Sequence, residues 1–158
     1  MALNLTSDHL TNRTLKMILD ENMEMTGKLT IELNGEVVQE IPNLVTTAGK
    51  GYVASRMKDA SATAMSHMAI GTNNTAAAAG NTALGAESAR QALTSTTVSG
   101  ADVVYVATFA AGTGTAALTE AGILNASSGG TMLCRTVFST INKAASDSMT
   151  ITWTVTAS

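Results

Sequence analysis

The sequence is poor in the side chains that usually build a large core. Aromatic residues make up only 3% of its 158 positions, although such side chains normally supply much of the burial energy of a domain. They are Tyr52, Tyr105, Phe109, Phe138 and Trp153. A chain of this kind gains stability by burying flat surface against copies of itself. The composition therefore predicts a homo-oligomer, and we expect a trimer.

Charged residues are also scarce, at 13%, which is about half of the usual share. The net charge is −3 and no basic patch occurs, so the composition argues against nucleic-acid binding. No apolar run approaches the roughly 20 residues that a membrane-spanning helix needs, and we expect no membrane insertion. The first residues, MALNLTSDHL, lack the pattern of a secretory signal.

Residues that could support catalysis or bind a metal are few. Cys134 is the single cysteine, which is consistent with synthesis in a reducing cytosol, and it reads as a small buried side chain. The two histidines, His9 and His67, lie far apart in the sequence and give no zinc-ligand spacing. A triad with His67 and a serine has no GxSxG elbow to support it, so a structural histidine is the favoured reading.

Glu120 is the most interesting acid, because LTEAGIL places it among apolar residues. It has no second carboxylate close by in the sequence for acid–base chemistry. We favour a structural carboxylate that accepts backbone hydrogen bonds or pairs with Arg135 across strands. The segment GTGTAA, residues 112–117, formally matches a dinucleotide-binding fingerprint but lacks the following helix and acid, and a hairpin turn accounts for it better. We expect no catalytic residue, no cofactor and no metal site.

The charges divide the chain into two parts. Most of the 12 acidic and 9 basic residues lie in the first 59 positions, and the rest is rich in Thr, Ala, Gly and Ser. We assign residues 1–42 to an N-terminal attachment arm and residues 43–158 to a β-sandwich domain. Within the arm, Ser7 or Asp8 could cap a helix over residues 10–23, although an arm that orders on a partner is equally compatible with the sequence.

The arm also contains a hairpin signal. KLTIEL and EVVQEI flank Asn34-Gly35, a dipeptide that permits positive φ at both central turn positions. Pro42 should end the second strand.

The second part predicts one helix followed by strands. NLVTTAGKGYVASRMKDA reads as a helix, and MSHMAIG as a short strand followed by a small-residue loop, NNTAAAAGNTALGAES. Four β segments follow, RQALTSTTV, DVVYVATF, TMLCRTVF and SMTITWTV. The last alternates cleanly, with Met149, Ile151, Trp153 and Val155 on one face. The expected fold is mainly β, a jelly-roll-like β-sandwich with one short helix.

Several segments from residue 43 to the end resemble small virion structural proteins of tailed bacteriophages. They are NLVTTAGKGYVASRM, MSHMAIGTNNTAAAAGNTALGAE, LTEAGILNASSGGTMLCRTVF and NKAASDSMTITWTV. The resemblance implies a β-sandwich module present in many copies on the particle, without a cofactor, and it transfers no catalytic residue.

The resemblance implies a capsid decoration or cement protein, which would bind the major capsid protein on the head exterior. The alternative is a tail-fibre or baseplate component that contacts tail proteins and host surface glycans through loops such as NNTAAAAGN. A cell-wall hydrolase is the remote alternative. Localisation on the virion, after synthesis in the host cytoplasm, follows from either structural role.

Overall fold

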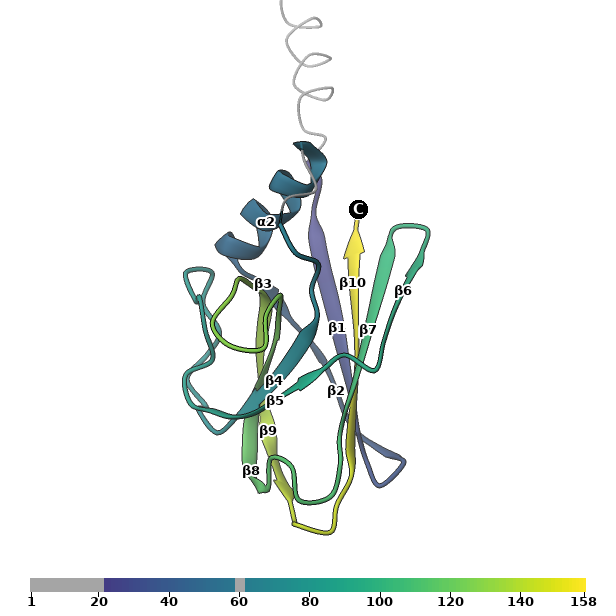
Figure 1. Cartoon of the computed structure of the whole chain (residues 1–158), viewed down its shortest axis with the longest axis vertical. Helices are drawn as coiled ribbons and strands as arrows, with labels where there is room; N and C mark the ends of the chain where they lie inside the picture. Colours follow the sequence, from purple (N-terminus) through teal and green to yellow (C-terminus); the bar gives the residue numbers. More distant parts are fainter. Residues whose placement is uncertain (1–21, 59–61) are drawn as a thin grey trace, which may run out of the picture.

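The computed structural model describes residues 22–58 and 62–158. In these residues the chain forms ten strands and one helix, labelled in Figure 1. The strands are β1 (Met25–Leu33), β2 (Glu36–Pro42), β3 (Leu44–Val45), β4 (His67–Gly71), β5 (Glu87–Ala92), β6 (Ser95–Ser99), β7 (Asp102–Phe109), β8 (Ala116–Leu124), β9 (Met132–Lys143) and β10 (Met149–Ala157), and the helix is α2 (Thr47–Lys58).

The strands form two five-stranded antiparallel sheets. Sheet A has the order β2-β1-β10-β7-β6, and sheet B has the order β3-β9-β8-β4-β5. Figure 1 shows them as two layers, and the main apolar cluster takes side chains from both. The predicted fold, a mainly β sandwich with one short helix, is confirmed, and its connectivity is compatible with the jelly-roll-like arrangement.

The hairpin predicted around Asn34-Gly35 is present as β1 and β2. Asn34 has a φ of 52° and Gly35 a φ of 84°, and a tight hairpin turn needs positive φ at both central residues. β2 ends at Pro42 as expected, because proline has no N–H to donate to a neighbouring strand.

This hairpin completes the sandwich. β1 lies between β2 and β10 and pairs with β10 along its whole length, and both Leu29 and Ile31 are fully buried in the core. The boundary predicted between residues 42 and 43 therefore does not separate two folding units. The charged residues that suggested an arm occupy outward positions, because Lys28 and Glu32 alternate with the buried residues. The predicted helix over residues 10–23, its caps Ser7 and Asp8, and His9 lie outside the described residues, apart from the last two positions of that helix.

β10 is the middle strand of sheet A and has the predicted alternation. Met149, Ile151 and Trp153 are 0% exposed and Val155 is 4% exposed, whereas the intervening threonines lie half-buried on the outer face. β10 pairs with β1 on one side and with β7 on the other. The strand therefore joins the two halves of sheet A.

The helix predicted over residues 43–60 is shorter, because Leu44 and Val45 pair with β9 as β3. The Thr46 hydroxyl accepts from the N–H of Gly49 at 2.9 Å, as an N-cap residue does. A Cβ at Gly49 would collide with the Leu133 carbonyl, so this glycine lets the first turn of α2 lie directly on β9.

Two further predictions need correction, and one strand was missed. The segment RQALTSTTV forms parts of two strands, since β5 belongs to sheet B and β6 to sheet A. LTEAGIL lies in β8, a strand that the sequence did not predict because nearly all of its residues are buried and no alternation marks it. The glycine-rich segment at 112–115 connects β7 in sheet A to β8 in sheet B, so it is a link between sheets and not a hairpin turn.

Trp153→Ala is expected to lower the free energy of unfolding by about 3–5 kcal/mol, the usual range for a large aromatic residue in a packed core. Trp153→Phe should cost less, because the buried indole N–H has no hydrogen-bond partner and its loss removes an unsatisfied donor. Urea unfolding measures both variants. In the native protein, Trp153 fluorescence should be blue-shifted and poorly quenched by iodide, and a red-shifted, freely quenched signal would contradict the register of β10.

Removal of residues 1–42 should abolish folding, because it deletes β1 and β2 and leaves β10 without a partner on one side. Removal of residues 1–21 leaves every described strand in place and should preserve a cooperative thermal transition. Circular dichroism melting of the two truncated chains measures the difference. A native-like transition for the chain that starts at residue 43 would restore the predicted domain boundary.

Candidate functional site

A buried ion pair joins β8 and β9 on the side of sheet B that faces away from the core. Arg135 Nε and Nη2 lie 2.9 Å and 2.8 Å from Glu120 Oε2, and the two side chains are only 3% and 0% exposed. The carboxylate also accepts backbone N–H groups from Gly85 at 2.9 Å and from Ala86 at 2.7 Å. Glu120 therefore makes both of the contacts considered for it from the sequence, the backbone hydrogen bonds and the ion pair with Arg135.

The pair fixes the loop between β4 and β5, residues 72–86, to the sheet. Arg135 Nη1 donates to the Asn81 side-chain oxygen and Nη2 to the Thr75 carbonyl, both at 3.1 Å. Leu84, within this loop, also packs on the sheet, in a small apolar cluster with Ala69, Leu124 and Met132. Figure 1 shows the loop on the side of sheet B away from sheet A.

Close approach of this loop requires small residues on the sheet. A Cβ at Gly122 would lie 2.7 Å from Leu84 Cδ1, and one at Gly71 would collide with the Ala86 carbonyl. The small-residue segment from Asn73 onward is thus a cover for the outer face of sheet B.

Burial opposes ionisation of the Glu120 carboxyl. The N–H groups of Ala86 and Gly85 and the Arg135 guanidinium outweigh burial and hold its pKa below the ordinary value. The Asn73 N–H also donates to Glu120 Oε1, at 3.3 Å. A carboxylate that is already ionised and occupied by these five donor contacts has no free proton to transfer and little open space for a substrate. The geometry of Glu120 suits a structural function.

A second charged group, Lys143, ties together turns at one end of the sandwich. Its Nζ donates to the Ala110 carbonyl at 3.0 Å and to the Asp147 carbonyl at 2.6 Å. The Asp147 carboxylate in turn accepts from Asn34 Nδ2 at 2.9 Å and from the Ala144 N–H at 2.8 Å. The β1–β2 turn, the β7–β8 link and the β9–β10 turn are therefore held in one network.

The other residues singled out in the sequence lie apart from the ion pair. His67 begins β4, and its Nδ1 is 2.8 Å from the hydroxyl of the adjacent Ser66. Within the described part of the chain, no carboxylate contacts the other ring nitrogen to complete a triad. Cys134 is fully buried, and this burial raises the pKa of its thiol, so the group is protonated and shielded from solvent.

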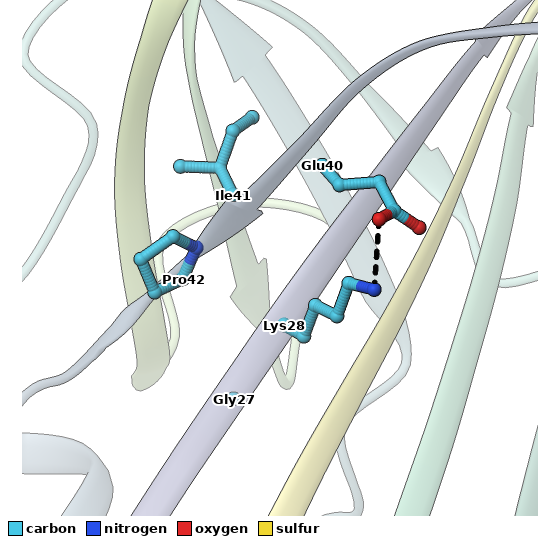
Figure 2. Close-up of a pocket in the computed structure, with 5 residues that line it drawn as sticks. All are labelled: Gly27, Lys28, Glu40, Ile41 and Pro42. Carbon is cyan, nitrogen blue, oxygen red and sulfur yellow. Dashed lines mark ion pairs between the residues drawn. The ribbon is translucent and has the colours of Figure 1, made fainter.

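A shallow hollow lies over β1 and β2, with Gly27, Lys28, Glu40, Ile41 and Pro42 around it (Figure 2). Lys28 Nζ and Glu40 Oε2 form an ion pair of 2.9 Å across the strands, but both side chains are more than half exposed. The hydrogen bond and the charge of Lys28 lower the pKa of Glu40. Exposed pairs of this kind contribute little to stability, and the hollow is too open to hold a small ligand firmly.

The outer face of sheet A carries a few charged residues, among them Lys28 and Glu32 on β1 and Asp102 on β7. Its centre is a set of threonines, which we call the threonine face: Thr26 and Thr30 on β1, Thr108 on β7, and Thr150, Thr152, Thr154 and Thr156 on β10. The pairs Thr26–Thr156, Thr30–Thr152 and Thr150–Thr108 lie directly opposite one another. The Thr108 and Thr150 hydroxyls are 3.0 Å apart. This face can offer hydroxyl groups and methyl groups to a partner over several strands.

The described residues include no group of three or more His, Cys, Asp or Glu side chains that could hold a metal ion. Within the same residues, no helix is long and apolar enough to cross a membrane.

Comparison with known proteins gave no match: no protein-family model, no curated protein and no solved structure is significantly similar to this chain.

Glu120→Gln should cost about 3–5 kcal/mol of unfolding free energy, because it leaves the Arg135 charge buried without its partner. The double variant Glu120→Gln with Arg135→Met removes both charges, and the amide oxygen can still accept from one of the two loop N–H groups, Gly85 or Ala86, so it should be more stable than Glu120→Gln alone. Urea unfolding at neutral pH measures the three proteins. Equal stability of the native protein and Glu120→Gln would contradict the anchoring role of the pair.

The same pair predicts a pH dependence. The folded-state pKa of Glu120 is lowered, so its contribution to stability is present above its unfolded pKa and is lost as the pH falls through the folded value. The native protein should therefore lose stability below about pH 4.5, and the Glu120→Gln variant should show a smaller loss over the same range.

Proposed function

We propose that the chain is a structural protein of a tailed-bacteriophage particle, which decorates the head and stabilises the capsid by binding its surface in multiple copies. The resemblance over residues 43–158 carries this proposal, since it extends over most of the sandwich. The trimer expected from composition stays a prediction.

The polar chemistry of the described chain supports a structural role. Glu120 and Lys143 each have their charged atoms occupied by contacts within the chain, and these contacts secure a loop and three turns. A rigid module with a large threonine-rich face suits a particle, because symmetry repeats each contact and weak contacts add up through multivalency. In this proposal the threonine face lies against a neighbouring protein, with the major capsid protein as the partner.

We still propose that the N-terminal part of the chain attaches the protein to the particle, but with a shorter attachment segment than residues 1–42. Residues 25–42 hold β1 and β2 inside sheet A, so they have a structural task in the sandwich. The attachment segment is therefore assigned to residues 1–21. Charged residues in that segment would set the register and orientation of docking more than its strength.

The tail-fibre or baseplate role is the alternative, with host glycans as ligands of the loop 73–81. In that loop the Asn73 side-chain oxygen accepts from the Thr75 N–H at 2.7 Å, and the Asn81 oxygen accepts from the Ala78 N–H at 2.8 Å. Because these amide oxygens already have partners, a sugar would have to bind the loop through exposed residues such as Asn74.

Counting the copies of this chain on purified virions tests the proposal. Quantitative mass spectrometry with labelled peptides should give a copy number comparable to that of the major capsid protein, and antibody labelling should mark the head. A small copy number with label on the tail would support the alternative. Absence of the chain from purified particles would contradict both roles. Hydrolysis of purified cell envelope by the isolated chain would support the remote alternative, a cell-wall hydrolase.

A further inference from the structure

The edges of the two sheets differ in how well they are protected. Sheet A ends at β2 and β6, and sheet B ends at β3 and β5. An edge strand leaves alternate backbone N–H and C=O groups without a partner in its own sheet, and proteins usually block such edges with proline, charge, bulges or covering segments. The four edges differ in how many of these protections they have.

The β2 edge has several of these protections. Pro42 ends the strand, Glu36 and Glu40 carry charge, and the pairing with β1 shifts between Ile31 and Glu32. The Gln39 amide also reaches the other sheet, donating to the Ser139 carbonyl at 2.6 Å and accepting from the Ser139 N–H at 3.2 Å. Pairing of another strand along β2 is opposed by these features.

Both edges of sheet B are protected as well. β3 has only two residues, and the chain continues from it into α2, which contacts β9. β5 carries the ion pair of Glu87 and Arg90 at 2.6 Å, and Arg90 also donates to the Ala126 and Gly129 carbonyls. The pairing of β5 with β4 shifts between Ile70 and Gly71.

β6 has none of these features. Its five residues, Ser-Thr-Thr-Val-Ser, include no charged residue and no proline, and all five are exposed. Its pairing with β7 is regular from end to end. Val98 is 69% exposed, although it lies opposite Val103, whose side chain packs against the core. Figure 1 shows β6 at the margin of the molecule beside β7.

We propose that β6 pairs antiparallel with β6 of a second copy of this chain and joins two sheets A into one continuous sheet. The register centred on Thr97 pairs all five residues. It places Thr97 opposite Thr97 of the second copy, Ser95 opposite Ser99, and Thr96 opposite Val98. The segment is thus complementary to itself: each pair is neutral, and threonine and serine pairs can share hydrogen bonds across strands.

Both faces of the strand fit this pairing. Thr96 and Val98 lie on the inner face with Tyr105 and Val103, so the pairing would cover Val98 with a threonine and a valine of the second copy. On the outer face, Thr97 lies opposite Val104, and the joined sheet would continue the threonine-rich outer face across the contact.

The contact is two-fold and therefore joins two copies, whereas the trimer predicted from composition would need a different contact. Pairing of five residues on each copy buries less surface than the roughly 1,200 Å² at which stable interfaces begin. The isolated dimer should therefore be weak and should form only at high protein concentration. The inference does not depend on the proposed function, because self-pairing of β6 can hold for the isolated chain whatever particle it belongs to.

A single introduced cysteine tests the contact. Thr97→Cys would lie opposite its own copy with Cβ atoms roughly 4.5–5.5 Å apart, close to what a disulfide requires. The native Cys134 is fully buried and should not react. The matched control is Val37→Cys, at a position that is 58% exposed on the protected β2 edge. Mild oxidation of the full chain should cross-link Thr97→Cys into a covalent dimer at least about tenfold faster than the control, since pairing raises the effective concentration of the thiols.

Equal cross-linking rates of Thr97→Cys and Val37→Cys would overturn the proposal. A charge exchange gives a second measurement that does not depend on thiol reactivity. Thr97→Lys alone and Thr97→Glu alone place like charges opposite each other and should sediment as monomers at concentrations where the native chain associates. An equimolar mixture of the two variants should associate again. If Thr97→Lys folds normally and still associates by itself to the same extent as the native chain, the proposed pairing of β6 is wrong.

Discussion

The pairing of β10 with β1 and β7 is the interaction on which the rest of the molecule depends. β10 brings the C-terminal residues between two strands from earlier parts of the chain, and its alternation decides which face of sheet A is buried. With few aromatic residues available, the core depends on this strand for its one tryptophan and for three aliphatic side chains in line with it. The same alternation sends the threonines outward, so the stability of the core and the character of the open face have one origin.

The charged groups divide in a related way. The few charges in the second part of the chain include Glu120, Arg135 and Lys143, which are buried and hold a loop and the turns at one end in place. Among the described charges of the first part, Lys28 and Glu32 lie on β1, and Glu36 and Glu40 lie on β2, where they help to protect an edge. The β6 edge has neither kind of charge. The uncharged β6 edge favours contact with other uncharged surfaces, including the same edge of a second copy of the chain.

The sequence predicted the features that depend on local pattern. The Asn34-Gly35 turn and the alternation of β10 are properties of neighbouring residues, and the isolated acid Glu120 indicated a buried partner, which is Arg135. Other features depend on contacts between distant residues. β8 lacks alternation because the loop 72–86 covers its outer side. No pattern within the residues of β8 indicates that a distant loop covers this strand. The arm boundary failed because charge density was taken to mark a separate segment, whereas Lys28 and Glu32 mark only the solvent side of a strand whose other side is buried.

Residue-resolved amide hydrogen exchange across sheet A, measured at low and at high protein concentration, tests this account most directly. The account predicts that the amides of β10 exchange most slowly at both concentrations, because they open only with global unfolding. The amides on the free edge of β6 should exchange quickly in dilute solution and slow down as copies associate. Exchange in β6 that is independent of concentration, or exchange in β10 as fast as in the edge strands, would contradict it.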